Sequence, residues 1–127
     1  MKHVAAVLIL AFLALPSTSF AAAPGDEYLG QCRMENGEFL VYQNKAQNIF
    51  KFHLTTASET QEVIFDRTLT WLWYEVDASY WKFRNGRHNG VFSWNFNSRL
   101  GHLKYVKGEY YYWRLTDCDI NERAISY

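Results

Sequence analysis

Apolar and polar residues alternate at a period of two along much of the chain, and this alternation limits the fold more than any other feature. The clearest case is IFKFHL, residues 49–54, where two Phe and one Leu share one side while Lys51 and His53 take the other. Successive side chains of a strand point to opposite faces of a sheet, so the pattern predicts a half-buried strand. No long segment has apolar residues at helical spacing.

Turn residues interrupt the alternation about every ten residues, as at Asn36-Gly37, residues 97–101 and Gly108. Short strands at this spacing, about seven to nine of them, predict an all-β domain that is a single antiparallel β-sandwich or a small barrel. Residues 69–76 have apolar side chains on both faces. That is typical of a central strand, or of one whose second face meets a partner.

The stretch WKFRNGRHNGVFSW, residues 81–94, contains Asn-Gly twice between aromatic arms. Asn-Gly favours a two-residue type I′ turn, so each copy specifies a different hairpin register. A third register pairs Trp81 with Trp94 and Phe83 with Phe92, and cross-strand aromatic pairs contribute up to about 1 kcal/mol each. We expect this third register, with the arms in the core and residues 85–90 forming a longer tip.

The first 21 residues have the features of a cleavable signal peptide. An apolar run at residues 4–15 follows a short basic start, and Ser19-Phe20-Ala21 fits the small-x-small cleavage pattern. This run is shorter than the roughly twenty residues that span a bilayer, and no later segment is apolar enough for a transmembrane helix. We expect an exported, periplasmic protein without a transmembrane anchor, whose mature chain, residues 22–127, is one all-β domain.

Cys32 and Cys118 are the two cysteines, and both lie in the predicted mature region. Disulfides persist in exported proteins, and this one would close a loop of nearly the whole domain, worth roughly 4 to 5 kcal/mol in the chain-entropy model. The C-x-x-C spacing of metal and redox sites is absent. We expect a structural disulfide, with two reduced cysteines as the alternative.

The composition supports neither an enzyme nor a metal or cofactor site. The mature histidines, His53, His88 and His102, lie outside any nucleophile motif and lack zinc-ligand spacing. A glycosidase needs two carboxylates at a defined separation, and the candidates by residue type alone are Glu59, Glu62, Asp66, Glu75 and Asp77. The sequence has no glycine-rich phosphate loop. Near-neutral charge gives no reason to expect nucleic acid or an anionic membrane as partner.

Two places concentrate Tyr, Trp and Arg, the residue types that most often dominate interface energetics. The predicted contacts at the hairpin tip are Arg84, Asn85, Arg87, His88 and Asn89. The second place is EYYYWR, residues 109–114, where alternation sends Tyr110, Tyr112 and Arg114 to one face. We expect these eight residues to bind a partner; the alternative is an ordinary Tyr-rich outer face.

The segment YLGQCRMENGEFLVY, residues 28–42, is similar to the Y-x-C-x-x-G-x-x-L-x-V opening of C-type lysozyme inhibitors. With the predicted signal peptide and the near-terminal second cysteine, the chain resembles small exported bacterial β-proteins that inhibit lysozymes or neutralise cell-wall-degrading toxins. Those inhibitors have a Ser-Gly-x-x-Tyr loop, whereas residues 82–86 here lack the Ser-Gly pair. The resemblance therefore implies an exported partner-binding β-domain, and not the lysozyme contact residues.

From these features we expect a periplasmic inhibitor or immunity protein that occludes the active site of a peptidoglycan-degrading enzyme or toxin. Its partner would be a secreted or periplasmic protein, a cell-wall hydrolase. Two alternatives stay open. One is a module that binds a small ligand or glycan with exposed Trp and Tyr, and the other is an exported enzyme that depends on its histidines.

Overall fold

The computed structural model describes residues 23–75, 80–87 and 89–125. The predicted signal peptide, His88 and Asp77 lie outside these described residues. Within them, the regular structure consists of strands and two short 3₁₀ helices, η1 (Arg67–Leu69) and η2 (Glu122–Ala124). That part of the chain includes no helix long and apolar enough to cross a membrane.

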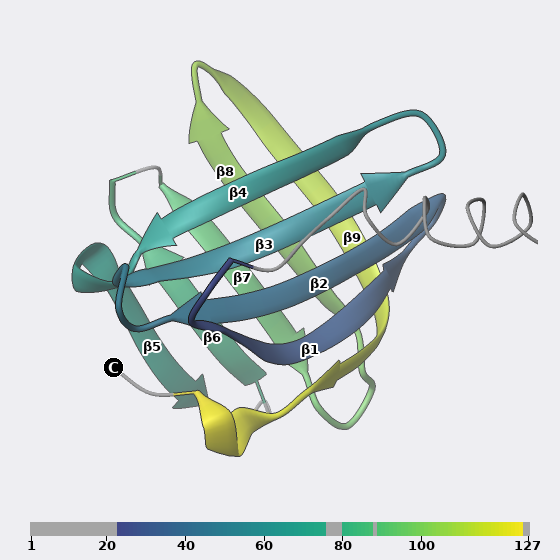
Figure 1. Ribbon diagram of the computed structural model, residues 1–127. Coiled ribbons are helices and arrows are strands. Elements are labelled where there is room, and N and C mark those ends of the chain that lie inside the picture. The colour runs from purple at the N-terminus through teal and green to yellow at the C-terminus, as the bar shows by residue number, and fades with distance from the viewer. Residues whose placement is uncertain (1–22, 76–79, 88, 126–127) are drawn as a thin grey trace, which may run out of the picture.

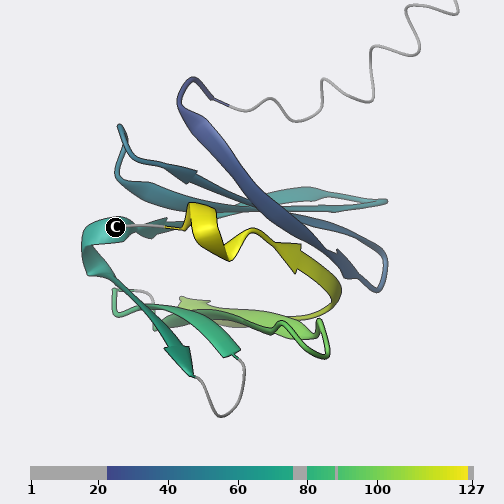
Figure 2. The same ribbon diagram turned by 90° about the horizontal axis from the view of Figure 1, so that it is seen from below.

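Nine antiparallel strands form one sheet in the order β4-β3-β2-β1-β9-β8-β7-β6-β5. Their bounds are β1 (Asp26–Met34), β2 (Gly37–Asn44), β3 (Ile49–Thr56), β4 (Thr60–Asp66), β5 (Thr70–Glu75), β6 (Tyr80–Asn85), β7 (Gly90–Asn95), β8 (Gly101–Lys107) and β9 (Glu109–Ile120). The sheet folds over without closing, so that β1–β4 form one layer and β5–β8 the other (Figures 1 and 2). The predicted antiparallel all-β domain is confirmed, as an open sheet in two layers.

Strand β9 belongs to both layers and makes the turn between them. Residues 109–115 pair with β8, and residues beyond them pair with β1. Asp117, at φ 49°, lies in the left-handed region within this turn. The predicted disulfide between Cys32 of β1 and Cys118 of β9 is confirmed, and both cysteines are buried. It fastens the two strands where the sheet bends.

Aromatic rings from the two layers meet in the core. Phe52 of β3 lies 5.0 Å from Phe92 of β7, and Phe50 lies 4.6 Å from Phe83 of β6, measured between ring centroids. The predicted inward face of IFKFHL is therefore confirmed. Its other face was expected to be open, yet Lys51 and His53 are also buried. Lys51 is held there because its Nζ donates to Asp26 Oδ2 at 2.8 Å.

The β6–β7 hairpin has the register that the ring pairs predicted, with Trp81 opposite Trp94 and Phe83 opposite Phe92. Its last pair joins Asn85 and Gly90, so neither Asn-Gly forms a two-residue turn. The second copy still has a conformational role. Asn89 has a φ of 44°, and the backbone of Gly90 lies so close to Phe65 that a Cβ would stand 2.7 Å from its ring.

Candidate functional site

The strand register brings the two predicted contact regions onto one surface, the outer side of the β5–β8 layer and the adjoining half of β9. Across it, Arg84 pairs with Val91, Val91 with Lys104, and Lys104 with Tyr112. Trp71 of β5 extends this row on the other side of Arg84. We call this surface the basic face and define it by Trp71, Trp73, Tyr80, Lys82, Arg84, Val91, Ser93, His102, Lys104, Val106, Tyr110, Tyr112 and Arg114.

Positive charge gathers on β6, β8 and β9 of this face, while β5 contributes Glu75, which is opposite Tyr80. The four permanent cations are Lys82, Arg84, Lys104 and Arg114, while the outward positions of β6, β7, β8 and residues 109–115 hold no Asp or Glu. Among the described residues, Arg84, Lys104 and Arg114 are in no ion pair. The whole chain has 13 basic and 13 acidic residues. The formal net charge of the chain is therefore zero although cations cluster on this face.

A shallow hollow of about 360 Å³ lies in the basic face. Its lining residues are Trp73, Lys82, Arg84, Asn89, Val91, His102, Lys104, Val106 and Tyr110. On one side of it, Lys82 Nζ lies 5.7 Å from the ring centroid of Trp73 and 5.6 Å from that of Tyr80. The ammonium thus rests against aromatic rings, where the ring quadrupole attracts it.

His102 lies at the centre of the face, half-buried among strands. Burial lowers its pKa, and the neighbouring charges of Lys104 and Lys82 lower it further, so the imidazole is neutral at pH 7. Ser93 Oγ lies 3.3 Å from Nε2 and 3.4 Å from Nδ1 of this ring. On the other side, the ring centroid of Tyr112 is 5.9 Å away.

Ser93 and His102 resemble a nucleophile and a base by residue type, but their surroundings fit a catalytic pair poorly. The Ser93 side chain is fully buried beneath the face. A base of this kind also needs a third group, usually a carboxylate, that orients the ring. The charged groups named above as acting on His102 are lysines instead.

The predicted contact residues of the hairpin tip lie in three different surroundings in the structure. Arg84 and Asn89 line the hollow of the basic face, whereas Arg87 lines another hollow of about 350 Å³ beside β4, with Glu62 and Asp66. Asn85 is fully buried and points into the protein. Its Nδ2 donates to Thr70 Oγ1 at 2.9 Å and to the Asp66 carbonyl at 3.3 Å, so Asn85 is not a surface contact in this structure.

Tyr110, Tyr112 and Arg114 all lie on the exposed side of β9. Trp71, Trp73, Lys82, His102 and Lys104 join them on the basic face, although the sequence did not single these residues out for binding. Alternation would have shown that Lys82, His102 and Lys104 point away from the core, whereas residues 69–76 have apolar side chains on both faces and leave Trp71 and Trp73 unassigned. Only the strand order shows that they share one surface with Arg84 and Tyr112.

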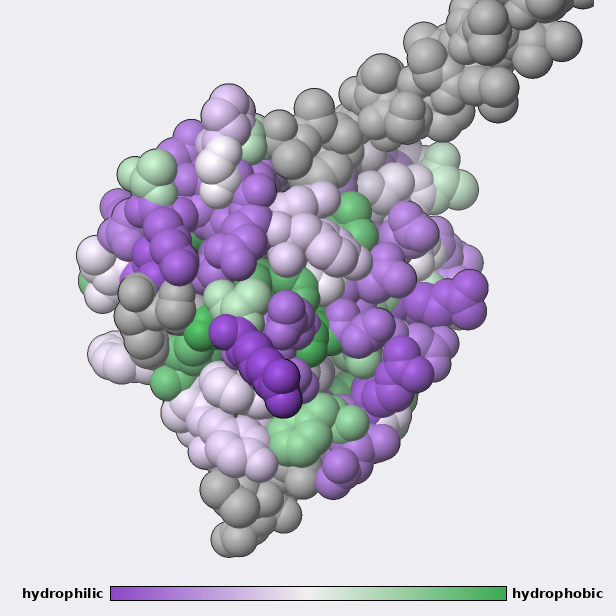
Figure 3. Space-filling model, turned by 60° about the horizontal axis from the view of Figure 1, so that its bottom comes forward, coloured by the Kyte–Doolittle hydropathy of each residue, from purple (hydrophilic) through white to green (hydrophobic). Residues whose placement is uncertain are grey.

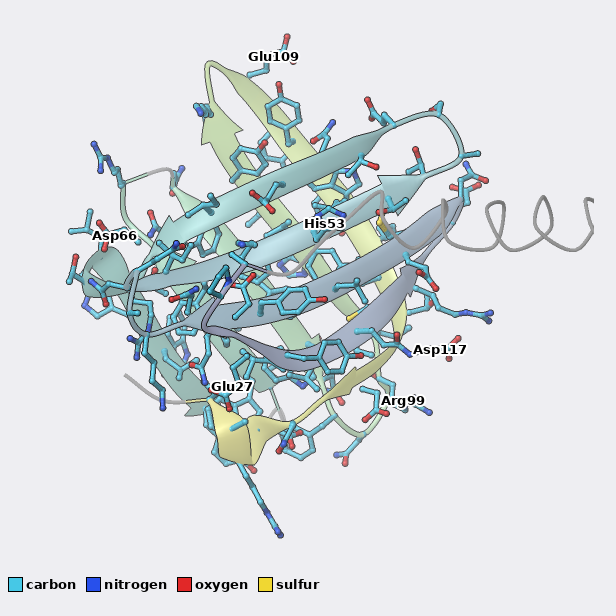
Figure 4. All side chains as sticks on the ribbon, in the orientation of Figure 1. Glu27, His53, Asp66, Arg99, Glu109 and Asp117 are labelled. Atoms are coloured by element: carbon cyan, nitrogen blue, oxygen red, sulfur yellow. A yellow bond between two sulfur atoms is a disulfide. The ribbon has the colours of Figure 1, made fainter. Side chains whose placement is uncertain are left out.

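Three of the candidate carboxylates, Glu59, Glu62 and Asp66, have structural partners. Asp66 Oδ1 accepts hydrogen bonds from Thr68 N and Oγ1 at 2.9 and 2.6 Å, which lowers its pKa and caps η1. Glu62 lies 3.8 Å from His53, and Glu59 accepts from Gln61. Figure 4 shows His53 on β3, Asp66 beside η1 and Glu109 at the outer end of the β8–β9 hairpin. Among the described residues, no group of three or more His, Cys, Asp or Glu could hold a metal ion.

The end of the molecule near η2 offers a weaker candidate surface. Figure 3 shows hydrophobic residues there in small areas separated by hydrophilic ones. The basic face, with its exposed rings and its hollow, is therefore the stronger candidate. Comparisons with protein-family models, curated proteins and solved structures find no match for the chain.

Proposed function

We propose that this protein is a periplasmic inhibitor or immunity protein that binds a cell-wall hydrolase through the basic face and occludes its active site. It would act by steric exclusion and perform no reaction itself. The observation that supports this most is the meeting of Arg84 and Tyr112, which are distant in sequence, on one surface with Trp71 and Lys104.

The aromatic side chains of this face are more exposed than a core role explains. The exposed fraction is 63% for Trp71, 64% for Tyr110 and 48% for Tyr112. Tyr, Trp and Arg dominate the energetics of protein interfaces because they bury a large area and also form hydrogen bonds. The strands that hold them are fixed by the aromatic core, so little conformational entropy is lost on binding.

The charge of the face also suits a hydrolase partner. Most glycosidases cleave with a pair of carboxylates that flank the scissile bond. A cationic surface complements such a cleft, which raises the association rate and favours one orientation.

A capture experiment tests the proposal. The purified disulfide-bonded protein, immobilised, should retain one cell-wall hydrolase from a periplasmic or secreted extract and should inhibit peptidoglycan cleavage by it. Replacing Tyr110 and Tyr112 by Ala should weaken binding at least tenfold, since central aromatic residues often contribute 2 kcal/mol or more each. Tyr28→Ala is the matched control, because Tyr28 is 51% exposed on the other layer. Failure to retain any hydrolase would refute the proposal.

Exposed Trp71 and the hollow beside Trp73 favour a second candidate, a module that binds a small ligand or glycan. Sugars stack on flat aromatic rings, and such stacking changes Trp fluorescence. Saturable quenching by a peptidoglycan fragment, lost in Trp71→Ala and accompanied by no hydrolase capture, would support this candidate over the inhibitor.

A further inference from the structure

We infer that the hollow of the basic face binds carboxylate side chains from an acidic segment of the partner protein. This rests on the proposed function, because it takes the same face and names the chemistry that the partner presents to it. The argument uses the spacing of the cations, the position of Lys82 and the surroundings of His102.

Two cations that line the hollow, Arg84 and Lys104, are close enough together to contact one carboxylate. Arg84 and Lys104 are in register with one strand between them, which places their backbones about 10 Å apart. Arg84, Val91 and Lys104 all line the hollow, and both cationic side chains are long enough to reach a carboxylate placed above Val91. Arg84 is exposed, and its planar guanidinium matches a carboxylate in two parallel hydrogen bonds.

The position of Lys82 favours a carboxylate over a neutral sugar ring. Its ammonium lies against Trp73 and Tyr80, so it covers one face of each ring and blocks stacking there. The same placement leaves the charge beside the hollow. An incoming anion therefore meets a cation that is already positioned, whereas a sugar would have to displace it.

His102 lines the hollow between these cations and adds no positive charge of its own in the free protein. His102 faces Ser93 on β7, Lys82 on β6, Lys104 on its own strand, and Tyr112 and Arg114 on β9. In the free protein this environment keeps the ring neutral. A bound carboxylate would offset the charge of the lysines and raise the His102 pKa, so this histidine reports occupancy of the hollow.

The test uses hexaglutamate peptide as the probe and the purified disulfide-bonded protein. In an NMR titration at low salt, the amide shifts should cluster at residues 82–84, 91–93 and 102–104, and the His102 pKa should rise. The double variant Lys82→Gln with Lys104→Gln should weaken peptide binding at least fivefold. The matched control, Lys45→Gln with Arg123→Gln, removes the same charge from exposed sites elsewhere and should change it less than twofold.

Several outcomes would overturn the inference. They are absence of peptide binding, equal weakening by both double variants, or tighter binding of hexagalacturonate, an acidic sugar, than of hexaglutamate. The proposed function fails separately. A hydrolase that is captured equally well by the Lys82 and Lys104 variant refutes only the inference, and peptide binding without hydrolase capture refutes only the inhibitor.

Discussion

Replacing Asn85 by Ala tests whether the hairpin tip is anchored from within. Asn85 is fully buried; its Nδ2 donates to Thr70 Oγ1 and the Asp66 carbonyl, and its Oδ1 accepts from Arg87 N at 3.1 Å. Each such hydrogen bond contributes about 1 kcal/mol net. Thr70 Oγ1 still donates to the Asp66 carbonyl at 2.7 Å, so one acceptor stays satisfied in the variant. We expect Asn85→Ala to lower the free energy of unfolding by about 2 to 3 kcal/mol.

Asn85→Asp has nearly the same shape and separates the hydrogen bonds from packing. The new carboxylate can accept from Arg87 N, but it cannot donate to the Asp66 carbonyl while it is ionised. We therefore expect a loss of stability at pH 7 that becomes smaller at acidic pH, where the protonated carboxyl regains a donor.

Urea unfolding, followed by Trp fluorescence and far-UV circular dichroism, measures both variants. Arg87→Ala is the control, because Arg87 is an exposed residue of the same tip, and we expect it to change stability by less than about 0.5 kcal/mol. An Asn85→Ala protein as stable as the Arg87→Ala protein would refute the anchoring role.

Three other predictions concern the disulfide, a glycine and a histidine. Replacing Cys32 and Cys118 by Ala should remove about 4 to 5 kcal/mol of stability, because the bridged residues are 86 positions apart; a chemical denaturation curve unchanged from wild type would contradict this. Gly90→Ala should cost about 1 to 3 kcal/mol in the same assay, since its Cβ would press on the buried Phe65 ring; unchanged stability would show that the ring yields freely. The His102 pKa is lowered in the folded state, so the unfolded chain takes up the proton first and stability falls as pH drops below about 6.5. His102→Gln should reduce the slope of a stability profile measured from pH 5 to 8, and the slope that remains should come from His53, whose pKa is also lowered by burial. An unchanged slope would refute the shift.

Features that follow from residue types and their spacing along the chain could be predicted from the sequence. The β6–β7 register followed from matching Trp81 with Trp94 and Phe83 with Phe92, because ring pairing outweighed either Asn-Gly turn. The disulfide followed from the presence of two cysteines in a chain that was predicted to be exported. The period of two gave the strands and the all-β class, although it could not choose between a closed barrel and an open sheet.

Features that depend on contacts across the sheet could not be predicted. Asn85 was expected at the surface because it belongs to the predicted hairpin tip, but its burial requires Asp66 and Thr70, which come from another segment. Lys51 was expected outside because it is charged, and its burial requires Asp26. The basic face was missed because near-zero net charge says nothing about how charges are arranged.

The inner side of the same strands fixes the geometry of the basic face. Phe83 of β6, Phe92 of β7 and Leu103 of β8 are aligned in register and fully buried. The residues next to each of them in its own strand must therefore point outward. A shift of the strand register by one residue would turn the side chain of Arg84 or Lys104 into the core, where an unpaired charge costs several kcal/mol. The core therefore holds the cations in place without contacting their charged ends. Substitutions at those ends should change binding while leaving the fold intact, which is the condition that the proposed binding experiments require.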